Sequence, residues 1–262
     1  MCLMSDGVRA AAAAAGDNPV VETGARLGYV ASGVLHLLLA WVTLQLAWFH
    51  GGAEADQTGA LHAMGSTGLG ALPLWVAVVG FGLLGVWQLT EAVLRRDAGA
   101  RVRAAGKGVA YVALVWTTAA VARGTRPSGS QQTVDLTASL MAAPLGRVLI
   151  GAGGLAVIGI GGYHVAKGWN ATFLTDLREH PGNWAVRAGR FGYVAKGTAL
   201  ILVGALFVTA AVTRHPEQAQ GLDGALRTLL DAPFGATLLT VVALGLAAYG
   251  VYSLVRARYA RV

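Results

Sequence analysis

The sequence predicts an all-α membrane protein whose six transmembrane helices form three tandem helical-hairpin repeats in a pseudo-three-fold arrangement. Three observations predict this fold class: few charged residues, six apolar stretches between charges, and a pattern that occurs three times. Of the 262 residues, 55% are hydrophobic and 13% are charged, whereas a soluble protein carries about 25% charged residues. The single cysteine, Cys2, excludes a disulfide scaffold.

The lengths of the apolar stretches decide which of them can span a membrane. About 20 helical residues cross a hydrocarbon core of about 30 Å. Two stretches, 108–122 and 197–213, are too short, so we expect their helices to extend through Lys107 and Lys196. The other four, which are long enough alone, are 27–49, 72–90, 148–166 and 232–255.

The distribution of lysine and arginine predicts the orientation. Fifteen of the 20 lie at the termini, in the connections between repeats and at the adjoining helix ends. Since cytoplasmic loops are rich in these residues, both termini are predicted to be cytoplasmic. The excess positive charge would face anionic lipid headgroups. Nucleic acid is not an expected partner, because no basic run alternates with aromatic residues on a soluble domain.

The repeat is visible at two places in each unit. Three openings with the same spacing begin at Arg26, Arg101 and Arg190, and each ends in a glycine seven residues later. The second halves share Gly-Ala-Leu at 59–61 and 224–226, and Pro-x-Gly at 144–146 and 233–235. We therefore divide the chain into a disordered cytoplasmic tail, three repeats and a cytoplasmic linker before the third repeat. In order, these are 1–21, 22–97, 98–172, 173–186 and 187–262.

The outer loop of each repeat is expected to carry a short helix. The best case is 222–231, whose apolar residues recur at helical spacing on one face. Pro144 and Pro233 are then predicted in the first turn of the following helix, where a missing N–H is tolerated. Aromatic residues near span ends predict an interfacial belt, made of Tyr29, Trp48, Trp75, Trp169, Tyr193 and Tyr259.

With these motifs, the chain resembles the actinobacterial membrane family catalogued as domain of unknown function 1206. The resemblance covers about 22–260 and rests on the repeat openings, the Gly-Ala-Leu loops and the Pro-x-Gly motifs. It implies a bacterial inner-membrane protein with six helices in three two-helix repeats. It implies no activity, substrate or catalytic residue. Ser32 and Gly68 depart from the pattern, so the three-fold symmetry is expected to be imperfect.

Equivalent polar positions in the three repeats would form rings around a three-fold axis. Such groups in the cytoplasmic half of a span face a bundle interior, a cavity or the headgroups. One interpretation is a basic vestibule that binds an anion or a lipid phosphate, with Glu91 as its counter-charge. The other is that the side chains snorkel and anchor helix ends. The rings are Ser32, Lys107 and Lys196; Gln88, His164 and Ser253; and Glu91, Lys167 and Arg256.

Other candidate sites are less well supported by the residues. His36 and His164 lie inside spans and could ligate haem, but a cavity-lining or hydrogen-bonded role fits single histidines better. The Gly80–Gly85 segment matches G-x-G-x-x-G without a preceding strand, so we interpret it as helix packing. No spacing typical of a metal site or a catalytic nucleophile occurs. We expect no catalytic residue, metal or cofactor.

Two classes of function remain open. The first is a non-enzymatic structural, accessory or lipid-binding membrane component. The alternative is a small anion or solute channel or carrier that uses the basic vestibule on the pseudo-three-fold axis. A third class of function is that of a haem or quinone protein. If the protein held haem, it would absorb visible light. A homo-oligomer or a partner membrane protein is compatible with each, because small-residue faces suit helix association.

Overall fold

The computed structural model describes residues 19–49, 54–65, 71–94, 97–125, 127–179 and 181–259, and this part contains no strand. Six of its helices are long and apolar enough to cross a membrane. The predicted all-α fold with six candidate spans is confirmed, and it indicates a multi-pass membrane protein. The long helices are α2 (Pro19–Phe49), α4 (Ala71–Leu94), α5 (Ala98–Ala122), α7 (Gly146–Trp169), α8 (Asn183–Thr213) and α10 (Gly235–Tyr259).

The two short apolar stretches are extended as predicted, since α5 and α8 both begin before Lys107 and Lys196. Of the predicted disordered tail at 1–21, residues 1–18 lie outside the described part of the chain. The remaining three belong to the first turn of α2, which starts at Pro19. Proline suits this position because it has no N–H to leave unpaired.

Short helices connect the long ones at one end of each repeat, which we call the loop end. They are α3 (Gln57–Gly65), α6 (Gly129–Met141) and α9 (Gly221–Leu230), and the last confirms the helix predicted at 222–231. The 3₁₀ helix η2 (Pro216–Gln218) precedes α9. At the opposite end, which we call the basic end, the 3₁₀ helix η1 (Thr172–Asp176) lies at the start of the predicted linker 173–186, and α8 begins within the last part of that linker.

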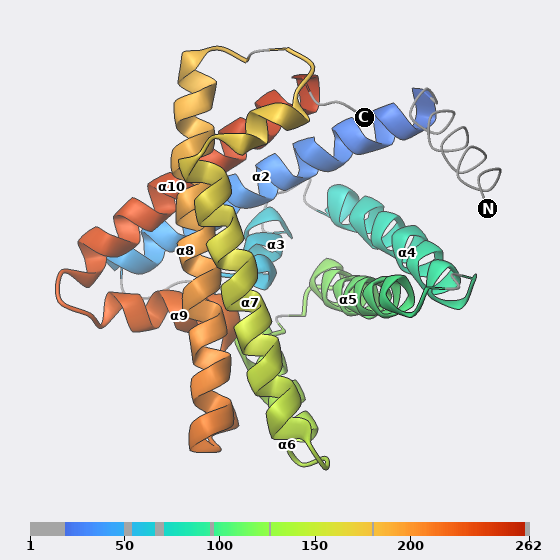
Figure 1. Cartoon of the computed structure of the whole chain (residues 1–262), viewed down its shortest axis with the longest axis vertical. Coiled ribbons are helices and arrows are strands. Elements are labelled where there is room, and N and C mark those ends of the chain that lie inside the picture. Colours follow the sequence, from blue (N-terminus) through green and yellow to red (C-terminus); the bar gives the residue numbers. More distant parts are fainter. Residues whose placement is uncertain are drawn as a thin grey trace.

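The long helices pack as three pairs that join successive repeats (Figure 1). Helix α4 packs along α5, α7 along α8, and α10 along α2. Each pair therefore combines the second long helix of one repeat with the first long helix of the next, and the third repeat closes back on the first. The two long helices within one repeat, which were expected to form a hairpin, pack less extensively than these pairs. Among them, α8 and α10 of the third repeat make the most extensive contact.

Glycines explain why the pairs form between repeats. The glycines that close the three repeat openings are Gly33, Gly108 and Gly197, and each lies where its pair crosses. A Cβ on Gly197 would stand 2.6 Å from the carbonyl oxygen of Gly161, and one on Gly33 would stand 3.0 Å from that of Gly250. Because only glycine permits such an approach, the repeated glycine sets the contact between helices.

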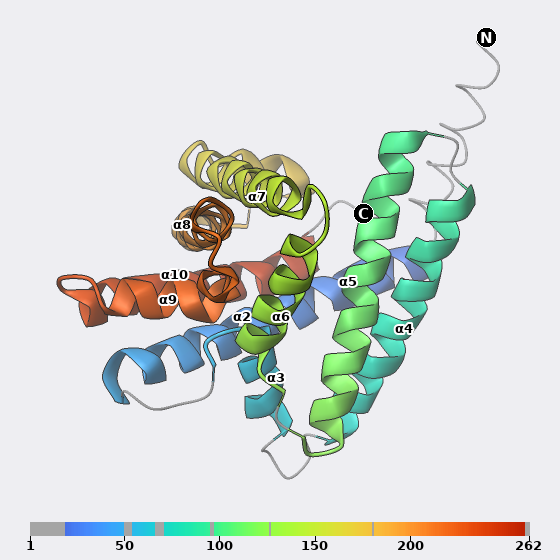
Figure 2. The same ribbon diagram turned by 90° about the horizontal axis from the view of Figure 1, so that it is seen from below.

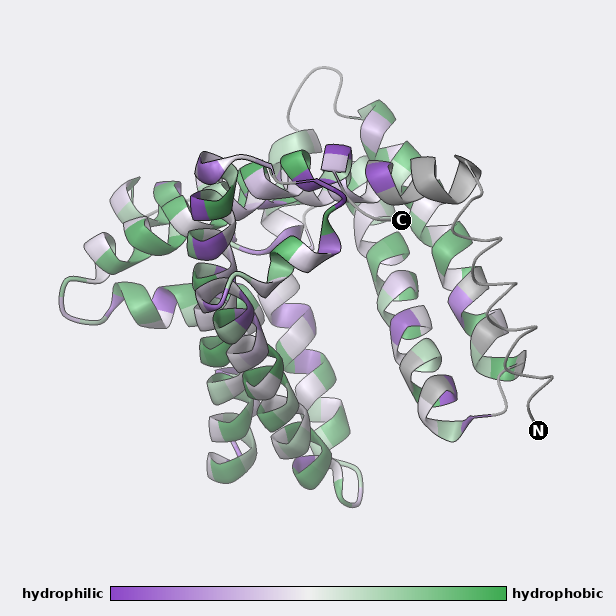
Figure 3. Cartoon of the chain, turned by 45° about the horizontal axis from the view of Figure 1, so that its top comes forward, coloured by the Kyte–Doolittle hydropathy of each residue, from purple (hydrophilic) through white to green (hydrophobic). Residues whose placement is uncertain are grey.

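The three pairs do not run parallel, so the compact bundle that a strict three-fold repeat would give is not formed. Figure 2 shows α8 nearly end-on and α7 obliquely, whereas α4 and α5 lie lengthwise. In the third repeat, a Cβ on Gly192 would meet the backbone of Tyr249 on α10. The equivalent Gly28 in the first repeat has nothing within 4 Å. The faces left open are largely hydrophobic (Figure 3), as lipid-facing helices are.

The Pro-x-Gly motifs differ from the prediction. Pro144 and Pro233 do not lie in a first helical turn but two residues before α7 and α10. The intervening Leu145 and Phe234 have φ values of 63° and 60°. This left-handed residue turns the chain sharply before each helix starts, so proline serves the turn and not the helix.

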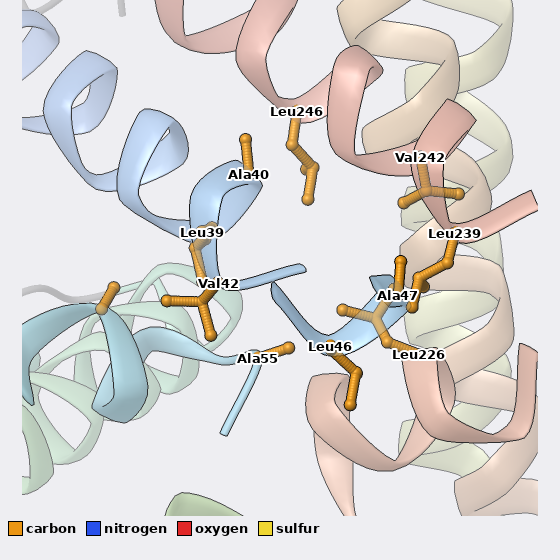
Figure 4. Packing of buried hydrophobic residues seen from close by; sticks show 11 residues of the cluster. Leu39, Ala40, Val42, Leu46, Ala47, Ala55, Leu226, Leu239, Val242 and Leu246 are labelled. Atoms are coloured by element: carbon orange, nitrogen blue, oxygen red, sulfur yellow. The ribbon is translucent and has the colours of Figure 1, made fainter. Parts of the chain in front are cut away.

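A group of buried apolar residues holds the α2–α10 pair against α9 near the loop end (Figure 4). Val42 and Leu46 of α2 are 1% and 2% exposed, and Leu226 of α9 is fully buried. In a lipid environment the gain comes from close packing, because lipid tails are as apolar as leucine. This core fixes the loop end of α2, which also lines a cavity described below.

Candidate functional site

The best-defined polar site lies at the basic end, where α7, η1, α8 and α10 meet. Four aromatic side chains, Phe173, Tyr193, Tyr249 and Tyr252, are 0–8% exposed and form one buried group. Around it stand four charged side chains: Lys167, Asp176, Lys196 and Arg256. We call these eight residues the aromatic–cation cluster.

The aromatic rings fix the geometry of the cluster. Tyr193 stacks on Phe173 with ring centroids 5.2 Å apart, and it meets Tyr249 edge-on at 5.1 Å. Phe173 meets Tyr252 edge-on at 4.9 Å. Stacked and edge-to-face pairs at such distances contribute about 0.5–1.5 kcal/mol each beyond burial. The cluster is therefore a stiff platform that joins η1 to α8 and α10.

The cations are held by one carboxylate and by ring faces. Asp176 accepts from Lys167 Nζ at 2.8 Å and from Arg256 Nη2 at 3.1 Å. Arg256 Nη1 donates to the Tyr193 hydroxyl at 3.2 Å, and Lys196 Nζ lies 4.3 Å from the Tyr249 ring centroid. Three cations and one carboxylate give the cluster a formal charge of +2.

Two buried polar atoms of the cluster have no hydrogen-bond partner among the described residues. They are the Tyr252 hydroxyl and the Arg256 Nε. Buried polar groups are almost always paired, because an unpaired one loses about 1–3 kcal/mol of solvation. Arg256 Nε can only donate and the tyrosine hydroxyl can donate, so an acceptor of hydrogen bonds would satisfy either of them.

The structure brings together the members of the predicted rings that lie on α7, α8 and α10. Lys167, Lys196 and Arg256 belong to the cluster, and the His164 ring stacks on Tyr193 at 5.9 Å. Ser253 is 3% exposed on α10, next to Tyr252.

Ser32 is tied to the same region through His36. The ring of His36 lies 4.5 Å from Tyr249. The carbonyl of Ser32 accepts from His36 Nδ1 at 2.7 Å. The two histidines thus pack on different tyrosines, His36 on Tyr249 and His164 on Tyr193.

The ring members on α4 and α5 lie elsewhere. Lys107 is exposed on α5, and Gln88 is half-buried on α4. The α4–α5 pair reaches the rest of the molecule mainly through α3, away from α7 and α8 (Figure 2). The side chain of Glu91 lies outside the described part of the structure. Of the two rings whose side chains are all described, neither therefore has its three members in contact.

Two of the three repeat-opening arginines bind the end of a neighbouring helix. Arg190 Nη2 donates to the carbonyl of Trp169 at 2.7 Å, and Arg101 Nε donates to that of Ala92 at 3.2 Å. Both carbonyls lie in the last turn of the helix that pairs with the arginine's own helix. Cations are favourable there, because the last carbonyls lack partners and carry the negative end of the helix dipole. The side chain of Arg26 is half-buried at the start of α2.

Several members of the cluster were not predicted from the sequence. Asp176 and Phe173 lie in the segment predicted as a linker, and Tyr193 was assigned to the interfacial belt but is only 2% exposed. Trp48 and Trp169 are 61% and 70% exposed, as the belt requires. One signal was available: Tyr252 shares its repeat position with Trp87 and Tyr163.

A second polar group lies at the loop end and joins α3, α6 and α9. Glu54 accepts from the Ser128 hydroxyl and, at 2.6 Å, from the Gly129 N–H at the start of α6. Asp223 of α9 accepts from Ala55 N at 2.8 Å and from Arg227 Nε at 2.7 Å. These bonds link the three loop helices to one another. No group of three or more metal-ligating side chains occurs within the described residues.

Near these bonds, burial raises the pKa of Asp56 from 3.8 to about 6. The neighbouring carboxylates of Glu54 and Asp223 add to this shift, and the Gly59 N–H, which donates to Asp56 at 2.9 Å, opposes it. Three carboxylates therefore lie together around Asp56 at the loop end, whereas the aromatic–cation cluster holds one.

Comparison with known proteins agrees with the repeat. The family described as Domain of Unknown Function (DUF1206) matches the chain at residues 27–95, 102–171 and 191–260, and each match spans the two long helices of one repeat. The uncharacterized protein YxxB of Bacillus subtilis (strain 168) is 28% identical, and the match covers 92% of each chain. No solved structure matches.

Proposed function

Because the chain belongs to the DUF1206 family, whose description supplies no activity, we propose from its geometry that it is a non-enzymatic membrane component that binds anionic lipid. The aromatic–cation cluster carries this proposal. It combines a charge of +2 with two buried donors that need an acceptor, Tyr252 Oη and Arg256 Nε. A lipid phosphate offers several acceptor oxygens and a negative charge, so it meets both requirements.

The same arrangement favours lipid binding over a channel or carrier. A conduction path would need the basic residues to line a water-filled space. In this structure they pack on tyrosine rings, and a cavity of about 820 Å³ elsewhere in the chain is lined by none of them. We further propose that the basic end faces the cytoplasm of a bacterial inner membrane, as the distribution of lysine and arginine predicts.

The test is retention of lipid by the purified full chain. Native mass spectrometry would compare phosphatidylglycerol with phosphatidylcholine for the wild type and for the double variant Lys167→Gln, Arg256→Gln. We expect retained phosphatidylglycerol to fall by about tenfold or more, since each cation near a headgroup contributes about 1 kcal/mol. Lys107→Gln is the matched control, because Lys107 is an exposed lysine outside the cluster.

Equal retention of both lipids by the wild type would refute the proposal. So would an unchanged phosphatidylglycerol signal in the double variant, or an equal loss in Lys107→Gln. Inorganic phosphate, added as a competitor, separates a site for the lipid from a site for a free anion. If phosphate alone displaces the lipid at low concentration, a soluble anion is the better ligand.

A further inference from the structure

A cavity of about 820 Å³ lies toward the loop end, between α2, α3 and the end of α5. Its volume falls within the range of about 300–1,000 Å³ that is usual for sites of small organic ligands. It is separate from the aromatic–cation cluster, with which it shares no lining residue. Its walls differ in chemistry from one side to the other, and this difference specifies a ligand.

One wall is apolar and belongs to candidate membrane spans. Leu38, Trp41 and Val42 of α2 and Val121 of α5 line it. Trp41 is 58% exposed, so its indole offers an open apolar face. Since both helices lie within candidate spans, this wall is suited to a hydrocarbon chain that enters from the bilayer.

Two polar side chains of the lining supply hydrogen-bonding groups of opposite kinds. Gln45 lines the cavity about one turn before the end of α2, and its amide makes no hydrogen bond with any described residue. An amide within a span needs a partner, because lipid tails offer none. Its NH₂ group can donate to a carbonyl of a ligand.

His62 of α3 is the second polar side chain of the lining. Its Nε2 lies 3.4 Å from the carbonyl oxygen of Pro127, which can only accept. Nε2 therefore carries the proton in the neutral ring, and Nδ1 is an acceptor. Within the described part of the chain Nδ1 has no partner, so it can accept from a hydroxyl group of a ligand.

The carboxylates near the cavity disfavour an anionic headgroup. Glu54 lines the same space, and both of its carboxylate oxygens are already bonded to the start of α6. Asp56 lies close enough to both Glu54 and Asp223 for their charges to interact. A phosphate placed here would meet negative charge, whereas an uncharged hydroxyl and ester would not.

From these walls we propose that the cavity binds an uncharged glycerolipid of the diacylglycerol type. An acyl chain lies along Leu38, Trp41 and Val121, an ester carbonyl accepts from Gln45, and the free hydroxyl donates to His62 Nδ1. The site would select neutral lipid at the loop end, independently of the anionic lipid proposed for the basic end.

The experiment uses the purified full chain in detergent and a diacylglycerol that carries a photoactivatable diazirine on one acyl chain. After illumination, peptide mass spectrometry maps the labelled residues. We expect label on α2 and the end of α5, displaced by unlabelled dioleoylglycerol but not by phosphatidylglycerol. Gln45→Leu keeps the side-chain volume and removes the donor, so labelling should fall about fivefold, the effect of one net hydrogen bond.

The matched control is Gln88→Leu, the same change in a half-buried glutamine of α4 that does not line the cavity. Thr125→Trp, which fills the cavity from its exposed rim, is a second variant and should abolish labelling if Gln45→Leu fails to fold by circular dichroism. Label mapped away from the cavity, equal competition by phosphatidylglycerol, or unchanged labelling in a folded Gln45→Leu or Thr125→Trp protein would overturn the proposal.

Discussion

At the scale of single residues, the identity of a repeated side chain does not decide its role. Lys107 and Lys196 occupy equivalent positions, yet Lys196 lies over the ring of Tyr249 and Lys107 is exposed on α5. The difference comes from the neighbours, because α8 packs against α10 while α5 has no such second partner. A sequence can place both lysines at equivalent depth, but it cannot say which of them meets an aromatic ring.

Asp56 gives a prediction at this scale. Because its pKa is raised to about 6, the folded state binds a proton more tightly than the unfolded state. The stabilisation that results is complete below about pH 4 and is lost as the pH rises through about 6. We expect thermal unfolding in detergent to show a decline in stability between pH 4 and 7 that is smaller in Asp56→Asn.

Asparagine preserves the shape at this position and can still accept from the Gly59 N–H, so the comparison isolates the proton. Asp135→Asn, which changes an exposed carboxylate on α6, should follow the wild type. A wild-type stability that is as insensitive to pH as that of Asp56→Asn would show that Asp56 does not titrate in this range.

At the scale of elements, the sequence predicted the helices well and their partners poorly. The six spans, the extension of α5 and α8 through their lysines, and α9 all follow from hydropathy and periodicity. The pairing between repeats depends on a carbonyl that approaches a glycine of another helix, as Gly161 approaches Gly197. Such an approach depends on the surfaces of both helices. The sequence of one helix therefore does not predict which partner it packs against.

The α7–α8 pair offers a test of that pairing. A Cβ on Gly161 would lie 2.7 Å from the carbonyl oxygen of Gly197 and 2.8 Å from a side-chain carbon of Ile201. Gly161→Leu should therefore force the helices apart and lower stability by about 1–3 kcal/mol, measured as the shift in thermal unfolding in detergent.

Gly159→Leu is the control, because nothing lies within 4 Å of that position on the same helix. It should be neutral or slightly stabilising, since leucine favours helix over glycine. If both variants were equally stable, α7 and α8 would not cross at Gly161.

At the scale of the whole molecule, the candidate site was only partly foreseeable. The aligned positions indicated Lys167, Lys196 and Arg256, because charge inside a span is rare and repeated charge rarer. Asp176 and Phe173 could not be predicted, since they lie in a connection between repeats that nothing in the sequence marks as buried. Their positions depend on how η1 packs against α8 and α10.

The orientation of the molecule can be tested with cysteines, because the chain contains one cysteine, Cys2. In a Cys2→Ser background, we expect Thr175→Cys at the basic end to resist a membrane-impermeant maleimide in intact bacteria. Ser139→Cys on α6 should react, because it is exposed at the loop end. Both should react in detergent, and the reverse pattern in intact cells would invert the proposed topology.

Because the third repeat packs on the first, the chain can be given new termini without loss of a helix pair. Helix α10 runs antiparallel to α2, with Arg256 over Tyr29 at one end and Trp48 bonded to Thr240 at the other. The three pairs thus form a closed circle in which no repeat is intrinsically first. A circular permutant, opened between α7 and α8 and joined from α10 to α2 by a short linker, keeps all three pairs. A single isolated repeat forms none of the three helix pairs. It would form three equivalent pairs by assembling as a trimer of identical units.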